Sequence, residues 1–592
     1  MEKKTFWAEE DWIGVEMNTI NKLKYLMDKR MKIKTVINLI LIMIGAAAEL
    51  LGVAAILPII NLAVDVNYEE DKICKIVMRL TGYQEREQIM LVVIAATIVI
   101  YIAKSMYLSW MYSRLYKFSA EIKKDMAVKL MRSYLIQPYA FFLKKNTSEL
   151  IRSVNSDTAQ LYEIVLNCLL FFSNALTAVV LMITLLVTNV AMTLTVVVLL
   201  AACAITIFLV VQKRTRYYGK RNQDLSAFLI KYLQQIFEGV KEIKILNTEK
   251  YFMEKYSKVY EEQANNMRKY SLCNLIPKYM IELVCIIGIM SYLAFNIMYN
   301  QNYMELIPQL GVFVMAAYKL LPAVNAAYAY LNTIVYHRAS IDLVYHDVKE
   351  ADDLEAKELF DSKNKIVKKF EKEICLNDIV FQYENAEKPV LNHVNLEIPK
   401  GKSVALIGPS GGGKTTTVDI ILGLLKPTNG EVLVDGENIA ECLENWRAKI
   451  GYIPQNIYLT DGSIKSNIAL GVPKEEIVEE QVWKALEEAQ LADFVRTLPE
   501  GLDTEVGERG ARISGGQRQR IGIARALYHS PEVLVFDEAT SALDNETEKE
   551  VMKAIDSLHG NKTMIMIAHR LTTIENCDMV YKVEKAQIVR ER

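Results

Sequence analysis

Six long apolar runs set the strongest constraint on how this chain can fold. They cover residues 36–64, 89–112, 164–187, 191–211, 275–299 and 306–328. About 20 apolar residues in a helix cross a bilayer, and the first run is longer than the core of a cleaved signal peptide. The chain is 52% hydrophobic and only 24% charged. The runs therefore predict an all-α transmembrane domain of six helices.

The positions of basic residues predict the orientation of these helices. Lysine and arginine are frequent in the segment before the first run and in the connections between runs two and three and between runs four and five. The two outer loops 188–189 and 300–305 contain neither residue. Because cytoplasmic loops carry the excess of positive charge, both termini are predicted to be cytoplasmic. We expect a multi-pass protein of the cell inner (plasma) membrane.

The two basic connections are predicted to be long cytoplasmic extensions of the spanning helices. No glycine or proline occurs in residues 83–137, 139–218 or 240–276. A helix of roughly 55 residues reaches about 80 Å, well beyond a hydrocarbon core of about 30 Å. We predict turning points at 138–148 and 239–248, where a soluble domain would be contacted. Ordinary solvated helical loops are the alternative.

Several ionisable residues lie inside the apolar runs. They are Glu49, Lys104, Lys278, Glu282 and Lys319. Charged groups are costly in lipid and usually face a cavity or a partner charge. Glu49, Lys104, Glu282 and Lys319 are therefore candidate cavity residues. Alternatively, Lys104 and Lys278 lie near span ends and extend to the interface.

The C-terminal part of the chain has a different composition. Eighteen of the 26 glycines lie between Gly401 and Gly560, among short β-branched strands and amphipathic helices. This pattern predicts an α/β domain over 371–592. The remaining predicted boundaries are a cytoplasmic N-terminal segment with an amphipathic elbow helix at 1–34, the transmembrane domain at 35–345 and a linker at 346–370.

A phosphate-binding loop is the clearest motif of this domain. The apolar strand 404–407 is followed by Gly-Pro-Ser-Gly-Gly-Gly-Lys-Thr at 408–415 and then by an apolar helix. Glycines allow backbone N–H groups to surround phosphates at the positive end of the helix. Lys414 would reach the β- and γ-phosphates of ATP, and the Thr415 hydroxyl would bind Mg²⁺.

A second apolar strand, 533–536, ends in two acidic residues, Asp537 and Glu538. An acidic side chain at a strand end beside a phosphate loop suits a Mg²⁺ site, and the next carboxylate can orient or deprotonate a water molecule. Without the phosphate loop, the pair would be an ordinary strand end.

Further motifs follow in a fixed order, and together they resemble those of ATP-binding cassette (ABC) proteins. Ile513-Ser514-Gly515-Gly516-Gln517 resembles the signature motif, whose first residue is more often leucine. Residues 504–510 resemble the segment with which exporter cassettes contact the membrane helices. Taken singly, Tyr383 could be an edge-strand aromatic, His569 a solvated turn residue and the signature glycines a plain helix entry. The whole layout resembles an ABC exporter half-transporter: six spans with long cytoplasmic extensions followed by one α/β P-loop cassette.

The resemblance implies roles for individual residues. The implied ATP-binding residues are Tyr383 (against adenine), Gly408, Pro409, Ser410, Gly411, Gly412, Gly413, Lys414, Thr415 and Thr416. The implied Mg²⁺ ligands are Thr415, Gln455 and Asp537, and the implied catalytic residues are Glu538, Gln455 and His569. The D-loop would be Ser541, Ala542, Leu543 and Asp544.

The resemblance also implies a dimer. Ser514, Gly515, Gly516 and Gln517 would complete the ATP site of a second cassette, so that two cassettes enclose two ATP molecules. No motif is degenerate, which favours a second copy of the same chain as the partner. The expected cofactors are ATP and Mg²⁺, and the expected partners are membrane lipid and an amphiphilic or lipid-linked substrate. A formal net charge of −2 gives no reason to expect nucleic acid.

Three local patterns resemble bacterial flippases of lipid-linked oligosaccharides. They are Glu49-Leu50-Leu51-Gly52-Val53 before Pro58, Pro277-Lys278-Tyr279 with Glu282, and Tyr318-Lys319-Leu320-Leu321-Pro322 before Asn325. Ile73, Ile76, Val77 and Leu80 also predict a short amphipathic helix in the first outer loop. The predicted function is ATP-driven export of an amphiphile, with a lipid-linked oligosaccharide as the favoured substrate. The alternatives are a peptide or multidrug exporter and a membrane-anchored ATPase that regulates a partner without transport.

Overall fold

The computed structural model describes residues 12–55, 59, 62, 72–83, 85–188, 190–299, 306–361, 370–384, 386–538, 545–568 and 575–592. Contacts divide the chain into two units. The membrane unit contains Met1–Gln137 and Lys145–Leu354, and the nucleotide unit contains Pro138–Lys144 and Glu355–Arg592. A short piece of the first long connection thus belongs to the C-terminal unit, although the predicted domains are continuous segments.

Within the described residues, every regular element of the membrane unit is a helix. Its elements are α1 (Trp12–Leu26), α2 (Lys29–Ala54), α4 (Lys72–Thr81), α5 (Arg86–Ile136), α7 (Thr147–Arg152), a π-helical turn (Ser153–Asp157), α8 (Thr158–Thr188), α9 (Val190–Glu238), α10 (Val240–Ile245), α11 (Glu249–Tyr299) and α12 (Leu306–Asp361). Among the described residues, five helices are long and apolar enough to cross a membrane, and they include α2, α5, α9 and α11. The sixth predicted span falls on the first part of α12, where the side chains of 306–317 lie outside the described ones.

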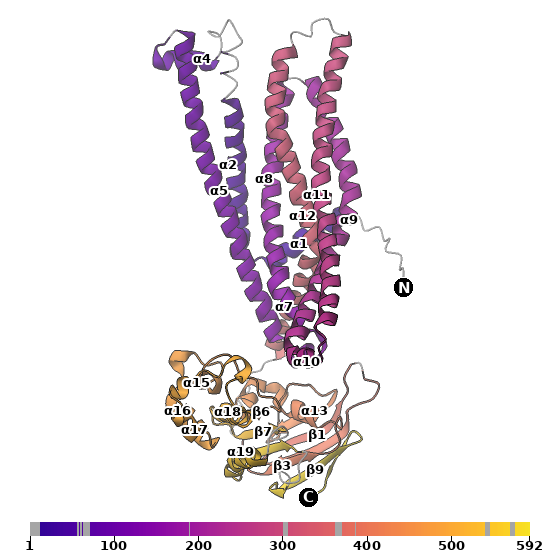
Figure 1. Cartoon of the computed structure of the whole chain (residues 1–592), viewed down its shortest axis with the longest axis vertical. Helices are drawn as coiled ribbons and strands as arrows, with labels where there is room; N and C mark the ends of the chain where they lie inside the picture. The colour runs from indigo at the N-terminus through magenta and orange to yellow at the C-terminus, as the bar shows by residue number, and fades with distance from the viewer. Residues whose placement is uncertain are drawn as a thin grey trace. The chain divides into compact units, whose positions relative to one another are not determined.

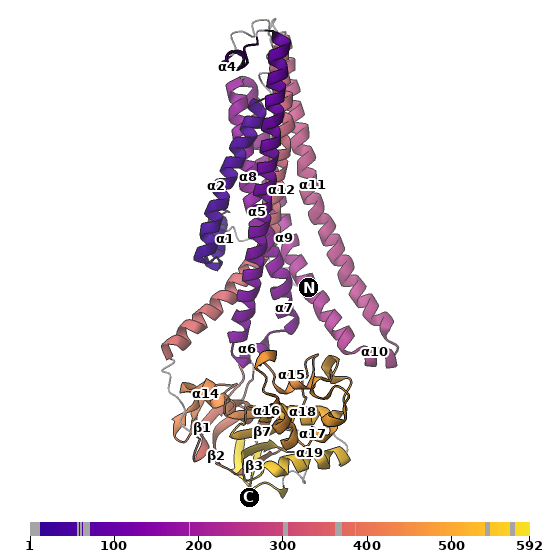
Figure 2. The ribbon, with the colours of Figure 1, turned by 90° about the vertical axis from the view of Figure 1, so that its left-hand side faces the viewer.

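The long helices run well past the apolar segments, as the glycine- and proline-free ranges predict for α5 and for much of α9 and α11, whereas α11 and α12 continue through Pro277 and Pro322. α5 has 51 residues, α9 has 49, α11 has 51 and α12 has 56. At 1.5 Å per residue, a helix of this length extends about 75 to 85 Å. α5 ends before Pro138 and α9 ends before Gly239, so both turning points fall where the sequence predicts them. α9 and α11 run side by side to the short helix α10 (Figure 2).

Two helix boundaries differ from the predicted ones. α2 begins at Lys29, seven residues before the first apolar run, because the intervening basic residues are good helix formers. α12 continues through much of the predicted linker to Asp361, since that stretch also lacks glycine and proline. The predicted outer helix is present as α4, whose Val77 and Met78 pack against the buried cluster of Leu62, Ile89 and Val93. Pro58 lies outside the described residues.

Packing within the membrane unit joins α2 to α5 and α8, and α9 to α11 (Figure 1). Gly219 of α9 lies directly against the backbone of α12, because a Cβ there would be 1.9 Å from the carbonyl oxygen of Tyr336. Asp157 of the π-helical turn is fully buried and accepts hydrogen bonds from Gln223 at 3.0 Å and from Ser340 at 2.7 Å. These contacts hold the long extensions together.

The nucleotide unit contains two sheets. Its strands are β1 (Glu373–Phe381), β2 (Leu391–Pro399), β3 (Ser403–Ile407), β4 (Asn429–Val434), β5 (Glu437–Asn438), β6 (Ile450–Ile453), β7 (Val533–Asp537), β8 (Thr563–Ile567), β9 (Met579–Glu584) and β10 (Gln587–Arg590). One sheet has the order β2-β1-β4-β5 and is antiparallel. The other has the order β10-β9-β3-β8-β7-β6, in which only the β10 pairing is antiparallel.

The larger sheet is covered on both faces. The helices of this unit are α6 (Tyr139–Lys144), α13 (Lys414–Ile421), α14 (Leu443–Arg447), α15 (Ile464–Ile468), α16 (Glu479–Glu488), α17 (Ala492–Thr497), α18 (Gly515–Leu527) and α19 (Asn545–Leu558). Val533 and Val535 of β7 pack with α13 and the antiparallel sheet. Leu534 and Phe536 face the other way and pack with α16, α18 and α19. α13 and α18 therefore cover opposite faces of the parallel strands.

Candidate functional site

The phosphate loop joins β3 to α13 in the predicted context. The ammonium group of Lys414 is buried and donates to the carbonyl oxygens of Gly408 at 2.9 Å and Pro409 at 3.0 Å. Gly408 has a φ of +142°, and a Cβ there would lie 2.2 Å from the carbonyl oxygen of Val583. Gly413 has a φ of +105° immediately before the helix. The loop is thus a glycine-lined cradle at a helix N-terminus, which suits a phosphate chain.

Tyr383 lies two residues beyond β1, at the edge of this cradle. Its ring contacts Phe381 edge to face, with ring centroids 4.9 Å apart, and its hydroxyl hydrogen-bonds with the Thr416 hydroxyl at 3.2 Å. The residue is 36% exposed. The ring is therefore fixed in orientation while still accessible, as a surface for stacking on adenine requires.

The acidic pair lies at the end of β7. Asp537 is 9% exposed, and burial together with the charge of Glu538 raises the pKa of its carboxyl. Glu538 has a φ of +48°, a conformation that non-glycine residues rarely adopt. Its Oε2 accepts a hydrogen bond of 2.8 Å from the Nε2 of Gln455. The structure thus brings together two of the three predicted catalytic residues.

The residues around Asp537 suit Mg²⁺ by the chemistry of their donor atoms. Thr415, Gln455 and Asp537 offer a hydroxyl, an amide carbonyl and a carboxylate, all of them the hard oxygen ligands that Mg²⁺ prefers. The amide nitrogen of Gln455 is used by Glu538, which leaves the amide oxygen as its free acceptor. Burial lowers the pKa of Lys414, and the two nearby carboxylates oppose that shift.

The signature residues form the N-terminus of α18. Ser514 Oγ accepts from the backbone N–H of Gln517 at 3.2 Å, and Gln517 Oε1 accepts from the backbone N–H of Ser514 at 2.9 Å. This reciprocal capping box fixes the start of the helix with Gly515 at its first position. α18 packs on the face of the sheet opposite α13, so the signature and the phosphate loop begin helices on different faces.

Two predicted parts of the site fall outside the described residues. They are His569 and the D-loop, Ser541, Ala542, Leu543 and Asp544.

Sequence reasoning missed two residues beside the acidic pair. Asp419 lies on α13 one helical turn after Thr415, and burial and the charge of Asp537 raise its pKa to about 6. Tyr452 of β6 donates a hydrogen bond of 3.4 Å to Asp537 Oδ2. A carboxylate within the otherwise apolar second turn of α13 is the signal that could have identified Asp419.

The short helix α6 belongs to this unit. Ala140 packs against the core that contains β1 and α13, and Lys144 forms an ion pair of 2.5 Å with Glu384 next to Tyr383. Burial, and then the charge of Asp419, raise the pKa of Tyr139. The first predicted turning point therefore contacts the strands and the helix that carry the nucleotide residues.

Three of the four candidate cavity residues form one cluster in the membrane unit. Glu49 Oε2 on α2 accepts from the ammonium of Lys104 on α5 at 2.7 Å and from that of Lys319 on α12 at 3.3 Å. The Lys104 side chain is 6% exposed, which excludes extension to the interface for this residue. Glu282 lies exposed on α11 and, among the described residues, is not part of this Glu49 cluster.

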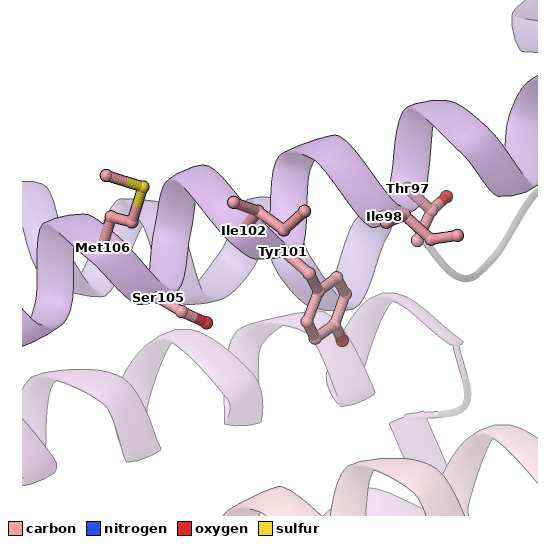
Figure 3. A pocket seen from close by; sticks show the side chains of 6 residues that line it. All are labelled: Thr97, Ile98, Tyr101, Ile102, Ser105 and Met106. Atoms are coloured by element: carbon pink, nitrogen blue, oxygen red, sulfur yellow. The ribbon is translucent and has the colours of Figure 1, made fainter.

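An open groove of about 550 Å³ lies along α5, near Lys104. It is lined by Thr97, Ile98, Tyr101, Ile102, Ser105 and Met106 (Figure 3). The centroid of the Tyr101 ring lies 4.9 Å from the Lys104 ammonium.

Fold and site together define a class of protein, a membrane-embedded P-loop ATPase with one helical membrane region and one nucleotide-binding domain. Residues 35–315 match the family profile of the ABC transporter transmembrane region, and residues 391–541 match that of the ABC transporter. The chain belongs to the ABC transporter family and has the layout of an exporter half-transporter, an ATP hydrolase coupled to transport.

Named relatives support this assignment. The chain is 30% identical over 469 residues to an ATP-dependent lipid A-core flippase of Cupriavidus metallidurans, covering 79% of this chain and 78% of that protein. It is 29% identical over 488 residues to a multidrug resistance ABC transporter ATP-binding and permease protein of Lactococcus lactis, covering 80% and 79%. A solved bacterial Atm1-family ABC exporter with ATP bound shares the fold, with a TM-score of 0.74, 22% identity and 95% of each chain covered.

Proposed function

We propose that the protein is a flippase that moves an amphiphile with an anionic head group, with a lipid-linked oligosaccharide as the favoured substrate. The Glu49 cluster carries this proposal. Two lysines share one carboxylate, so the cluster has a formal excess of one positive charge within the apolar segments. An uncompensated charge in lipid is costly, and a phosphate-bearing head group would neutralise it. The relative named as a lipid A-core flippase supports the same class of substrate.

The ATP site would work as follows. Lys414 and the backbone of 408–413 bind the phosphates, Tyr383 stacks on adenine, and Thr416 holds the Tyr383 hydroxyl. Thr415, Gln455 and Asp537 would hold Mg²⁺, which neutralises charge on the phosphates. Glu538 orients the attacking water, while Gln455 holds that carboxylate in place and His569 contacts the γ-phosphate. Positioning and charge stabilisation supply most of the rate acceleration.

A second copy of the chain would complete each site. α13 and α18 lie on opposite faces of one sheet, which supports a scheme in which Ser514, Gly515 and Gly516 would serve the phosphate loop of the second copy and not their own. We propose a homodimer in the inner membrane, with both termini and the ATPase domain in the cytoplasm.

The test is flipping by the purified protein in proteoliposomes. A fluorescent polyprenyl-pyrophosphate glycan is placed in one leaflet, and its exposure to an impermeant quencher is followed with and without ATP. We expect ATP-dependent flipping that falls in Lys104→Gln and in Lys319→Gln. Lys278→Gln is the matched control, since this lysine lies in the adjacent α11 and its charge is directed toward the Tyr279 ring.

The Lactococcus relative supports one second candidate, export of a drug or peptide. Turnover stimulated by such a compound, without flipping of the glycolipid, would establish that function in place of ours.

A further inference from the structure

The side chain of Tyr452 lies on the face of the sheet that carries the acidic residues. β6 and β7 are parallel neighbours, with Tyr452 opposite Val535. Val533 and Val535 pack on the face of the sheet that α13 covers. Because every second residue of a strand points to the same face, Asp537 at the end of β7 lies on that face too. Ile450, two residues before Tyr452, packs on the same face. The phenol therefore runs along the sheet toward the end of β7, where its hydroxyl meets Asp537 Oδ2 at 3.4 Å.

Asp537 stands among other negative groups. Glu538 follows it directly, and the carboxylate of Asp419 on α13 is close enough to interact with that of Asp537. Among the described residues, the Tyr452 hydroxyl donates a hydrogen bond to Asp537, whereas the Lys414 ammonium donates to the carbonyls of Gly408 and Pro409. Without a hydrogen-bond donor, repulsion would turn the Asp537 carboxylate away from its neighbours.

Tyr452 is 37% exposed, and α6 lies on the same face of the sheet. The helix α6 packs on this face through Ala140, and Tyr139 is close enough to contribute to the raised pKa of the Tyr452 phenol, for which burial is the main cause. A phenol is protonated at neutral pH, so Tyr452 remains a donor to a carboxylate. The ring is rigid, and its orientation is set by two χ angles only.

We propose that Tyr452 is a positioning residue that holds the Asp537 carboxylate in the orientation required to bind a divalent cation. The proposal rests on the proposed function of Asp537 as a ligand of that cation. Tyr452 itself contacts neither nucleotide nor metal in this scheme. Its loss therefore weakens cation binding and leaves the binding of nucleotide without metal unchanged.

The experiment measures Mn²⁺ binding by electron paramagnetic resonance on the full-length protein in detergent, with saturating ADP. Tyr452→Phe removes only the hydroxyl group, and Tyr458→Phe is the matched control, because Tyr458 is 67% exposed on the same segment. Affinity for a fluorescent ATP analogue in EDTA is measured in parallel. We expect Tyr452→Phe to bind Mn²⁺ about tenfold more weakly, the loss that one hydrogen bond to a charged group produces. Metal-free nucleotide affinity stays within twofold, and Tyr458→Phe matches the wild type.

The Asp537→Asn variant distinguishes the proposed role of Asp537 as a cation ligand from the proposed role of Tyr452 as a positioning residue. If Asp537→Asn loses Mn²⁺ and Tyr452→Phe does not, the positioning role is overturned while the ligand role stands. If Asp537→Asn binds Mn²⁺ like the wild type, the proposed ligand role itself is wrong. If Tyr452→Phe loses metal-free nucleotide binding as well, Tyr452 supports the whole domain, which also overturns a specific positioning role.

Discussion

Replacing Glu49 by glutamine tests whether the charge cluster is an integral part of the membrane unit. The substitution keeps the side-chain volume and removes the only carboxylate of the Glu49 cluster. At an effective dielectric constant of 20, attractions at 2.7 and 3.3 Å amount to about 6 and about 5 kcal/mol. Repulsion between the two lysines and the cost of desolvation offset most of this attraction. Breaking a buried pair costs about 3 to 5 kcal/mol, because the remaining charge is left unpaired.

The expected result is a lower thermal stability of the purified protein. At roughly 2 °C per kcal/mol for a large domain, Glu49→Gln should unfold about 6 to 10 °C below the wild type. A thiol-reactive fluorescent dye can report the transition, since Cys285 of α11 is buried and becomes accessible on unfolding. Glu282→Gln is the matched control. Glu282 also lies within an apolar run, but its side chain is exposed.

A double variant completes this test. Glu49→Gln with Lys104→Met leaves only the half-exposed Lys319, so most of the lost stability should return. Equal midpoints for Glu49→Gln, Glu282→Gln and the wild type would refute the reasoning. In that case water or lipid head groups, and not Glu49, would compensate the two lysines.

Three further predictions concern the nucleotide unit. Glu538→Gln should lower steady-state ATP hydrolysis at least 100-fold while ATP affinity in a filter-binding assay stays unchanged, since the carboxylate orients water and does not hold nucleotide; full activity would sink this assignment. Gly408→Ala should abolish ATP binding, because its Cβ would clash with Val583, whereas Gly560→Ala, whose Cβ meets open space, should bind normally. Asp419 has a folded-state pKa raised to about 6, so its ionisation destabilises the fold as pH rises from about 4 to 6. Asp419→Asn without nucleotide should therefore melt higher than the wild type above pH 6 and equally below pH 4, and a pH-independent difference would contradict this cause.

Local features of the chain were predictable because they depend on neighbouring residues. Apolar runs of more than 20 residues and stretches without glycine or proline determine long helices directly, and α5 and α9 end where Pro138 and Gly239 interrupt them. The phosphate loop is equally local, since its glycines, Lys414 and the flanking strand and helix are contiguous. The capping box at Ser514 also follows from residues three positions apart.

Contacts between distant segments could not be predicted in this way. Glu49 is 55 positions from Lys104 and 270 positions from Lys319. Their pairing depends on how α2, α5 and α12 are rotated against one another. The same holds for Tyr452 and Asp537, 85 positions apart, which meet only because β6 and β7 are neighbours in one sheet. The amino-acid sequence by itself thus determined a membrane-embedded ABC ATPase and the identity of its motifs. Only the tertiary structure decided which charges are compensated, because the free energy of a buried charge depends on the partners that packing brings within a few ångströms.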